Sequence, residues 1–379
     1  MSDIVESPAP PFSPTDCPVL VIKIGSSLLV ESDGSVRRDW LVSLVADIAY
    51  RSAAGQKIIL VASGSIALGA RRLGFEKGGR ANLADAQASA SVGQILLAGT
   101  WAELLGEHGL TAAQMLLTLG DLEDRRRYLN ATATLNRLVE AGAIPIINEN
   151  DSVATGGIRF GDNDRLAARI AQAAGADGVL LLSDIDGLYD RNPALPGARH
   201  IAEVRELTPE IRAMADNSSG SGMGTGGMGV KLEAARIAAL AGIKLAIING
   251  KGDRPLAVYE ASQRGTLFFP HRSENARKSW LGGRFTAHGS VHVDEGAINA
   301  LKEGKSLLAA GATRIEQEFD RGDVVDIVNP EGVVIARGLT EYDSDDARKI
   351  CGRRSDDIEV LLGYAPRSAL VHRDQLVLL

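Results

Sequence analysis

This chain of 379 residues is poor in cysteine and has no apolar run long enough to span a membrane. Its two cysteines, Cys17 and Cys351, lie far apart in the sequence, so neither a disulfide framework nor a cysteine-based metal site is indicated. The N-terminus lacks the basic stretch and apolar core of a secretory signal peptide. We therefore expect a protein of the reducing cytoplasm.

Positive charge is also scarce, because 41 Lys and Arg stand against 48 Asp and Glu, for a net charge of −7. Nucleic acid and anionic membranes are therefore not favoured as partners. Residues 289–379 hold 11 Lys and Arg against 17 Asp and Glu, so a net charge of −6 lies there. Because RNA binding relies on basic patches, we expect this part to act in assembly or regulation and not to bind RNA appreciably.

The length suggests two domains, and the pattern of apolar residues predicts different folds for them. Up to about residue 250, short apolar runs alternate with helical patterns, which predicts a mainly parallel sheet with helices on both faces, a three-layer α/β sandwich. The expected strands cover residues 19–24, 57–61, 143–147, 178–182 and 243–248. An Ala- and Leu-rich helix is expected over 81–108, with a role as a subunit interface.

The boundaries follow from changes in composition. Residues 1–18 are rich in proline and predict a disordered extension, and the α/β domain is expected over 19–270. A polar stretch followed by Gly282-Gly283 indicates a linker over 271–288. Short β-like pieces separated by turns predict a small β-rich domain over 289–379.

The stretch 148–164 gathers acidic and amide side chains directly after an expected strand. Its members are Asn148, Glu149, Asn150, Asp151, Asp162, Asn163 and Asp164. Carboxylates are costly to bury alone, so their natural partners are lysines, a substrate ammonium or a metal. A solvated acidic loop is the plainer alternative, and the residues at other strand ends count against it.

Polar residues also follow three other expected strands. Lys23 lies at the end of the first, Ser63-Gly64-Ser65 follows the second, and Ser183-Asp184 follows the fourth. In an open parallel sheet, ligands bind at the C-terminal ends of the strands. One such residue would be an ordinary turn, but their joint placement indicates a binding site.

A glycine-rich loop over 219–231 precedes a helical pattern over 230–241, an arrangement suited to phosphate binding. The loop lacks the Gly-Lys-Ser/Thr of a P-loop. Gly224-Thr-Gly-Gly-Met-Gly229 matches G-x-G-x-x-G, but no strand is expected just before it, so a dinucleotide-dependent oxidoreductase is disfavoured.

Together these residues indicate phosphoryl transfer. Lys23 and Lys231 would stabilise the charge that develops on the transferred group, and Asp164 would hold both lysines. Asp162 is the candidate to face a magnesium-bound nucleotide. No histidine lies in these motifs, which is compatible with a carboxylate acceptor, because a carboxylate needs no base at neutral pH.

Several motifs resemble the amino acid kinase family, and most closely its glutamate-phosphorylating branch with a C-terminal PUA domain. They are Val21-Ile-Lys-Ile-Gly-Ser-Ser27, Ala62-Ser-Gly-Ser-Ile66, Ile147-Asn-Glu-Asn-Asp151, Gly161-Asp-Asn-Asp164, Gly224-Thr-Gly-Gly-Met-Gly-Val-Lys231 and Val293-Asp-Glu-Gly-Ala297. The resemblance covers roughly residues 19–376. It implies the amino acid kinase fold followed by a small PUA barrel, and ATP-dependent phosphorylation of the side-chain carboxylate of L-glutamate, the first step of proline synthesis.

The resemblance also assigns roles to residues. It gives Lys23, Lys231 and Asp164 to catalysis. The glutamate site would comprise Ser63, Gly64, Asn148, Asp151 and Asn163. The ATP site would comprise Lys23, Ser183, Asp184, Thr225, Gly226, Gly227, Met228, Gly229, Val230 and Lys231, with Mg²⁺ held mainly by the phosphates. A dimer or tetramer, feedback inhibition by proline and a downstream reductase that takes over the acyl phosphate are further implications.

The sequence departs from the family pattern at Gly156-Gly157, where an acidic residue is common, which puts glutamate affinity and proline sensitivity in question. Ser183 replaces a common threonine and keeps the hydroxyl, and Val230 replaces a small hydroxyl residue. Two alternatives stay open, a kinase of another acidic amino acid and an RNA-associated PUA protein with a degenerate kinase domain.

Overall fold

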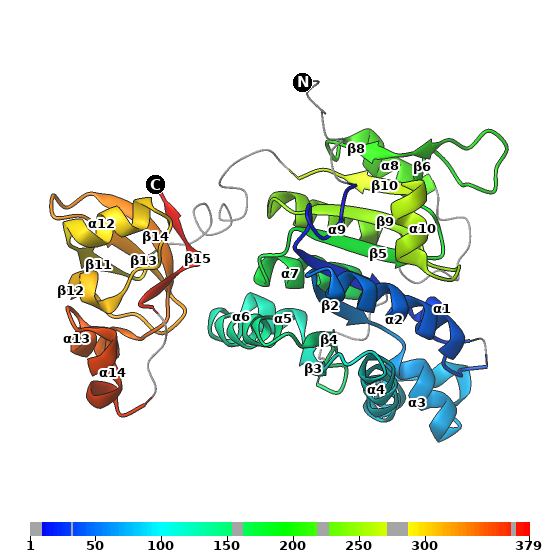
Figure 1. Ribbon diagram of the computed structural model, residues 1–379, viewed down its shortest axis with the longest axis horizontal. Coiled ribbons are helices and arrows are strands. Elements are labelled where there is room, and N and C mark those ends of the chain that lie inside the picture. The colour runs from blue at the N-terminus through cyan, green and yellow to red at the C-terminus, as the bar shows by residue number, and fades with distance from the viewer. Residues whose placement is uncertain (1–9, 32, 154–161, 218–226, 271–286, 365–368) are drawn as a thin grey trace, which may run out of the picture. The chain divides into compact units, whose positions relative to one another are not determined.

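The computed structural model describes residues 10–31, 33–153, 162–217, 227–270, 287–364 and 369–379 (Figure 1). It divides into two compact units, one of Met1–Leu122 with Thr132–His271 and one of Glu123–Ala131 with Arg272–Leu379. Throughout the described ranges, each helix is either too short or too polar to cross a membrane.

The first unit is built on an eight-stranded sheet with the order β3-β4-β2-β1-β5-β9-β10-β8. Neighbouring strands are parallel except that β10 runs antiparallel to β9. The strands are β1 (Val19–Ile24), β2 (Lys57–Ala62), β3 (Ala112–Leu117), β4 (Ile144–Glu149), β5 (Gly178–Ser183), β8 (Glu203–Val204), β9 (Lys244–Asn249) and β10 (Gly265–Phe268). All five predicted strands are confirmed, whereas the edge strands β3 and β8, and β10 between β9 and β8, were not expected.

Helices cover both faces of this sheet. The described helices that lie in or run into this unit's chain segments are α1 (Ser26–Leu29), α2 (Arg38–Ala53), α3 (Ser65–Leu73), α4 (Leu83–Gly106), α5 (Leu119–Glu123), α6 (Arg125–Glu140), α7 (Asp162–Ala173), α8 (Pro209–Asn217), α9 (Met228–Leu240) and α10 (Pro255–Ser262). Residues 123–131, at the end of α5 and in the first half of α6, belong to the second unit. A 3-10 turn, η1 (Glu76–Gly79), links α3 to α4, and a small ribbon pairs β6 (Leu188–Tyr189) with β7 (His200–Ile201).

Alternation along each strand divides the core into two layers. In β1, Leu20, Ile22 and Ile24 pack with α2, α4 and α10, whereas Val21 packs with α7 and α9 on the other face (Figure 1). Because successive side chains of a strand point to opposite faces, a strand buried on both sides must be apolar throughout. The three-layer sandwich predicted from the sequence is confirmed.

The prediction of disorder over residues 1–18 is wrong for its second half. Phe12 and Cys17 are fully buried, and Arg51 and Gln56 both donate hydrogen bonds to the Phe12 carbonyl oxygen. Asp16 pairs with Lys244 at the start of β9. Proline content alone predicted an unstructured chain, but these long-range contacts fix residues 10–18 on the sheet; residues 1–9 lie outside the described ranges.

Helices α3 and α4 approach each other to backbone contact. A Cβ at Gly93 would lie 1.7 Å from the Ser65 carbonyl oxygen, and one at Gly69 would lie 1.8 Å from that of Ser89. Glycine is therefore required at this crossing. Ile95 and Leu96 of α4 are exposed. The expected role of this helix as a subunit interface stays a prediction.

A pair of glycine substitutions in α4 tests this crossing. Gly93→Ala should lower the thermal unfolding midpoint, because the added methyl group forces the helices apart at a cost of about 1–3 kcal/mol or more. Gly99 lies in the same helix with nothing within 4 Å of a Cβ, so Gly99→Ala should raise the midpoint slightly. Differential scanning calorimetry measures both, and a Gly93→Ala protein as stable as Gly99→Ala would contradict the close packing.

The second unit carries a five-stranded sheet of order β12-β11-β13-β14-β15. Its described elements are β11 (Gly289–Val293), α12 (Glu295–Lys302), η2 (Ala309–Gly311), β12 (Ala312–Glu316), β13 (Val324–Val328), β14 (Val334–Thr340), α13 (Ser344–Ile350), α14 (Ser355–Leu362) and β15 (Val371–Leu378). Alternating residues such as Val291, Val325 and Ile327 face a separate apolar core. The β-rich character expected after residue 289 is confirmed, and the expected linker 271–288 lies almost wholly outside the described residues.

Candidate active site

Lys23 lies near the C-terminal end of β1, with its neighbours Val61 of β2 and Leu181 of β5 on either side. The two-residue period of the strand puts Lys23 on the same face as Val21, toward α7 and α9. The Lys23 ammonium group therefore lies on the face of the sheet that α7 and α9 cover, near the first turns of these two helices.

Asp164 lies in the first turn of α7, and Lys231 lies in the first turn of α9. Lys23 Nζ is 2.6 Å from Asp164 Oδ1, and Lys231 Nζ donates to Asp164 Oδ2 over 2.9 Å. The Asp164 side chain is 0% exposed and each lysine side chain is 9% exposed. One buried carboxylate thus holds two ammonium groups together at the sheet edge where ligands bind.

Burial and pairing with an opposite charge shift the pKa of each of these groups in opposite directions. Burial alone would raise the pKa of Asp164, but Lys23 and Lys231 outweigh it and bring that pKa below the ordinary aspartate value. Burial lowers the pKa of Lys23, against the attraction of Asp164 and with the repulsion of Lys231. With both lysines protonated the cluster carries a net charge of +1, so an anion such as a phosphoryl group would complete it.

Three of the residues predicted to bind the acceptor form one hydrogen-bonded cluster. Asn163 Nδ2 donates to Ser63 Oγ over 2.7 Å and to Asn148 Oδ1 over 3.0 Å. Asn148 is a buried residue near the C-terminal end of β4, Ser63 follows β2, and Asn163 lies in the first turn of α7 beside Asp164. The structure therefore brings these three residues together.

Asp151 and Gly64 lie next to this cluster in the chain. Asp151 is buried just after β4, and Gly64 adopts a left-handed φ of 109° between β2 and α3. Burial lowers the pKa of Arg80, and the charge of the Asp151 carboxylate opposes this shift. Arg80 was not expected from the sequence.

On the other side of Lys23, Ser183 ends β5, and its hydroxyl lies 3.3 Å from Asp184 Oδ1. Asp184 is close enough to favour the charged form of Lys23. Of the predicted ATP-site loop, Gly227 caps α9, and Met228, Gly229, Val230 and Lys231 form its first turn. Thr225, Gly226, Gly156-Gly157 and the side chain of Asp162 lie outside the described part of the chain.

Sequence reasoning missed Gln94, and it placed Ser65 in the turn after the second strand without giving it a role. Asn148 Nδ2 donates to Gln94 Oε1 over 2.8 Å and to Ser65 Oγ over 3.2 Å. Gln94 stands between the buried Ala90 and Leu97 on the inward face of α4. A polar residue within an apolar helical stripe is the signal that could have pointed to it.

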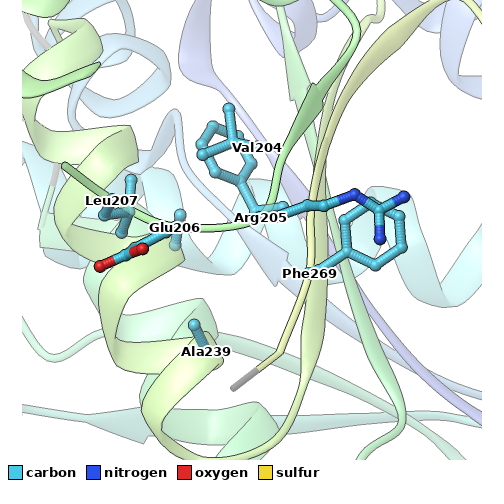
Figure 2. A pocket seen from close by; sticks show the side chains of 8 residues that line it. Val204, Arg205, Glu206, Leu207, Ala239 and Phe269 are labelled. Carbon is cyan, nitrogen blue, oxygen red and sulfur yellow. The ribbon is translucent and has the colours of Figure 1, made fainter. Parts of the chain in front are cut away.

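Figure 2 shows a small hollow lined by a different set of residues. Its lining includes Phe268, Phe269 and Ala239, and the Arg205 guanidinium carbon lies 4.5 Å from the centre of the Phe269 ring. Ala239 is near the end of α9, whereas Lys231 is near its start, roughly 12 Å apart at 1.5 Å per residue. This hollow is therefore not part of the lysine site.

The fold and the paired lysines are compatible with an enzyme that transfers phosphoryl groups, and comparison with known proteins gives the family. The model of the amino acid kinase family matches residues 18–249, and that of the PUA domain matches residues 289–362. The chain belongs to the amino acid kinase family.

Its curated relatives include proteins named glutamate 5-kinase. The one from Novosphingobium aromaticivorans is 63% identical over 96% of each chain. The one from Sphingopyxis alaskensis is 62% identical over 97% of this chain and 99% of its own length, and the one from Zymomonas mobilis is 58% identical over 97% and 93%. A solved structure of isopentenyl phosphate kinase aligns with 66% of this chain at 17% identity and a TM-score of 0.45, too remote a likeness to carry weight.

Replacing Asp164 with Asn tests the buried ion pairs. At pH 7 we expect Asp164→Asn to lower the free energy of unfolding by about 3 kcal/mol or more, because two buried lysines lose their counter-charge. Since the folded-state pKa of Asp164 is depressed, its contribution should shrink as the pH falls below about 4, where the unfolded carboxylate is protonated.

Urea unfolding at pH 7 and at pH 3.5 measures this difference. Glu103→Gln, which breaks an exposed pair with Arg38, is the matched control and should cost less than about 1 kcal/mol. Equal costs for the two variants at pH 7 would contradict the role of Asp164.

Proposed function

We propose that this chain transfers the γ-phosphoryl group of ATP to the side-chain carboxylate of L-glutamate, which yields L-glutamyl 5-phosphate and begins proline synthesis from glutamate. The names of its relatives, at 58% to 63% identity over nearly the full chain, support this substrate. The order of residues across the sheet is the structural observation that carries the proposal.

The strand order β4-β2-β1-β5-β9 sets out the site from acceptor to donor. Asn148 lies near the end of β4 and Ser63 follows β2, Lys23 lies near the end of β1 in the middle, and Ser183 ends β5 on the far side. A glutamate bound at β4 and β2 and an ATP bound at β5 would therefore meet beside Lys23. The transferred group would pass between the two lysines.

Phosphoryl transfer to a carboxylate asks little covalent chemistry of the protein. The acceptor is already ionised at neutral pH, so no general base is needed. Negative charge on the transferred phosphoryl oxygens is met by the ammonium groups of Lys23 and Lys231, which Asp164 holds in place. Positioning and charge stabilisation are the catalytic effects that these residues provide.

We assign the glutamate ammonium to the buried Asp151 carboxylate and to Asn163, with Ser63 and the Gly64 backbone around the substrate. Ser183, Asp184 and the first turn of α9 are assigned to ATP, because the positive end of the α9 helix suits its phosphates. These roles follow from the resemblance and from the placement of each residue at the strand ends.

Mg²⁺ would accompany ATP at this site. Within the described ranges no three acidic, histidine or cysteine side chains converge on one point. We expect Mg²⁺ to take its ligands mainly from the ATP phosphates and water, as it commonly does. Asp162 remains the candidate protein ligand of Mg²⁺ that the sequence predicts.

The product is an acyl phosphate, which hydrolyses readily in water, so we propose that a downstream reductase takes it over. Proline is the expected feedback inhibitor. Gly156-Gly157, the residues on which that sensitivity would depend, lie outside the described residues.

Hydroxylamine trapping tests the proposed reaction, because hydroxylamine converts acyl phosphates to coloured hydroxamates. Purified protein with Mg-ATP should give a signal with L-glutamate and none with L-aspartate or N-acetyl-L-glutamate. A signal with aspartate alone would overturn the substrate and keep the reaction class. Folded, ATP-binding protein that gives no signal with any of the three would favour the RNA-associated alternative.

Lys231→Ala tests the role of the second lysine in the same assay. We expect kcat to fall by roughly 10²–10³, the scale for one donor that stabilises a transition state. Lys57→Ala is the matched control, because Lys57 is exposed at the start of β2, at the opposite end of the strands. An unchanged kcat in Lys231→Ala would remove this lysine from catalysis.

A further inference from the structure

We propose that Gln94 of α4 is a positioning residue of the acceptor site, which fixes the Asn148 amide and, through it, the Asn163 amide. This inference rests on the proposed function, since it concerns how the same site recognises its amino acid substrate. It is carried by a chain of hydrogen bonds that runs from α4 through β4 to α7.

The direction of this chain is set by a backbone group. The Glu149 N–H, which can only donate, donates to Asn148 Oδ1 over 2.9 Å. The Asn148 oxygen must therefore face this N–H, and its Nδ2 must face Gln94 Oε1 and Ser65 Oγ. A flipped Asn148 amide would place its oxygen against that of Gln94 and its amino group against the Glu149 N–H.

The next amide in the chain is fixed by the same logic. Because Asn148 Oδ1 is an acceptor, Asn163 must present Nδ2 to it, and this amino group also donates to Ser63 Oγ. The remaining atom, Asn163 Oδ1, is buried and accepts no hydrogen bond from any described residue. An unpaired buried acceptor is costly, and a substrate ammonium would satisfy it.

The position of Gln94 is fixed by close packing, as a residue that orients the Asn148 amide requires. Gly93, the residue before it, touches the Ser65 backbone so closely that a Cβ would lie 1.7 Å from the carbonyl oxygen. The Gln94 side chain is buried, and within the described residues its Nε2 has no partner. Its bond to Asn148 through Oε1 is therefore the contact that repays part of the cost of burying a glutamine on an apolar helix face.

Gln94→Met removes the acceptor oxygen and keeps the length of the side chain. We expect KM for the amino acid to rise roughly 3- to 10-fold, the scale of one neutral hydrogen bond. KM for ATP should stay within about 2-fold, because the nucleotide residues lie beyond Lys23. Gln87→Met makes the same chemical change on the same helix and should leave both constants unchanged. Ser65→Ala, which removes the second acceptor of Asn148, should act in the same direction, and calorimetry establishes that each variant is folded.

A double-mutant cycle with Asn148→Ala separates positioning from a general structural role. If Gln94 acts through Asn148, Gln94→Met should change KM by less than 2-fold once Asn148 is Ala. Independent, multiplicative effects on KM would overturn the inference, as would a Gln94→Met enzyme with wild-type KM.

The cycle is run with whichever acid gives the hydroxamate signal. A substrate other than glutamate would therefore refute the proposed function and leave the coupling between Gln94 and Asn148 to be judged by its own result.

Discussion

The rest of the site depends on one interaction, the pairing of the buried Asp164 carboxylate with two lysines. Three charges can be kept out of water only if they pair closely, and here one carboxylate serves two ammonium groups. That pairing requires the end of β1 and the starts of α7 and α9 to converge. It also leaves an excess positive charge in a buried place, which is what a transferring phosphoryl group needs.

The two faces of the sheet contribute different residues around this cluster. The layer with α7 and α9 supplies Asp164 and Lys231, whereas the layer with α3 and α4 supplies the polar groups that hold Asn148. Asn163, one residue before Asp164, connects the two parts, because its amide bonds to Asn148 and Ser63. In the proposed mechanism, recognition of the acceptor and placement of the cations are therefore linked through the first turn of one helix.

Much of this arrangement could be predicted from the sequence, because it depends on local patterns. Continuous apolar runs predicted the parallel strands, and polar residues at their ends predicted which side chains meet at one edge. The parts that could not be predicted depend on tertiary contacts. Residues 10–18 are ordered by Arg51 and Gln56, and the edge strand β3 has the mixed burial of a surface element. Gln94 is far from the motifs in sequence and joins them only through the crossing of α3 and α4.

The most direct test of the central claim measures how tightly the protein binds an analogue of the transferring phosphoryl group. Calorimetry would compare the affinity for Mg-ADP with glutamate, with and without aluminium fluoride, in the wild-type protein and in Lys231→Ala. We predict that aluminium fluoride tightens ADP binding at least 100-fold in the wild type, as transition-state analogues do, and that Lys231→Ala loses most of this gain while binding ADP itself. An equal gain in both proteins would contradict the account, because the cluster of Lys23, Asp164 and Lys231 would then not be what stabilises the transferred group.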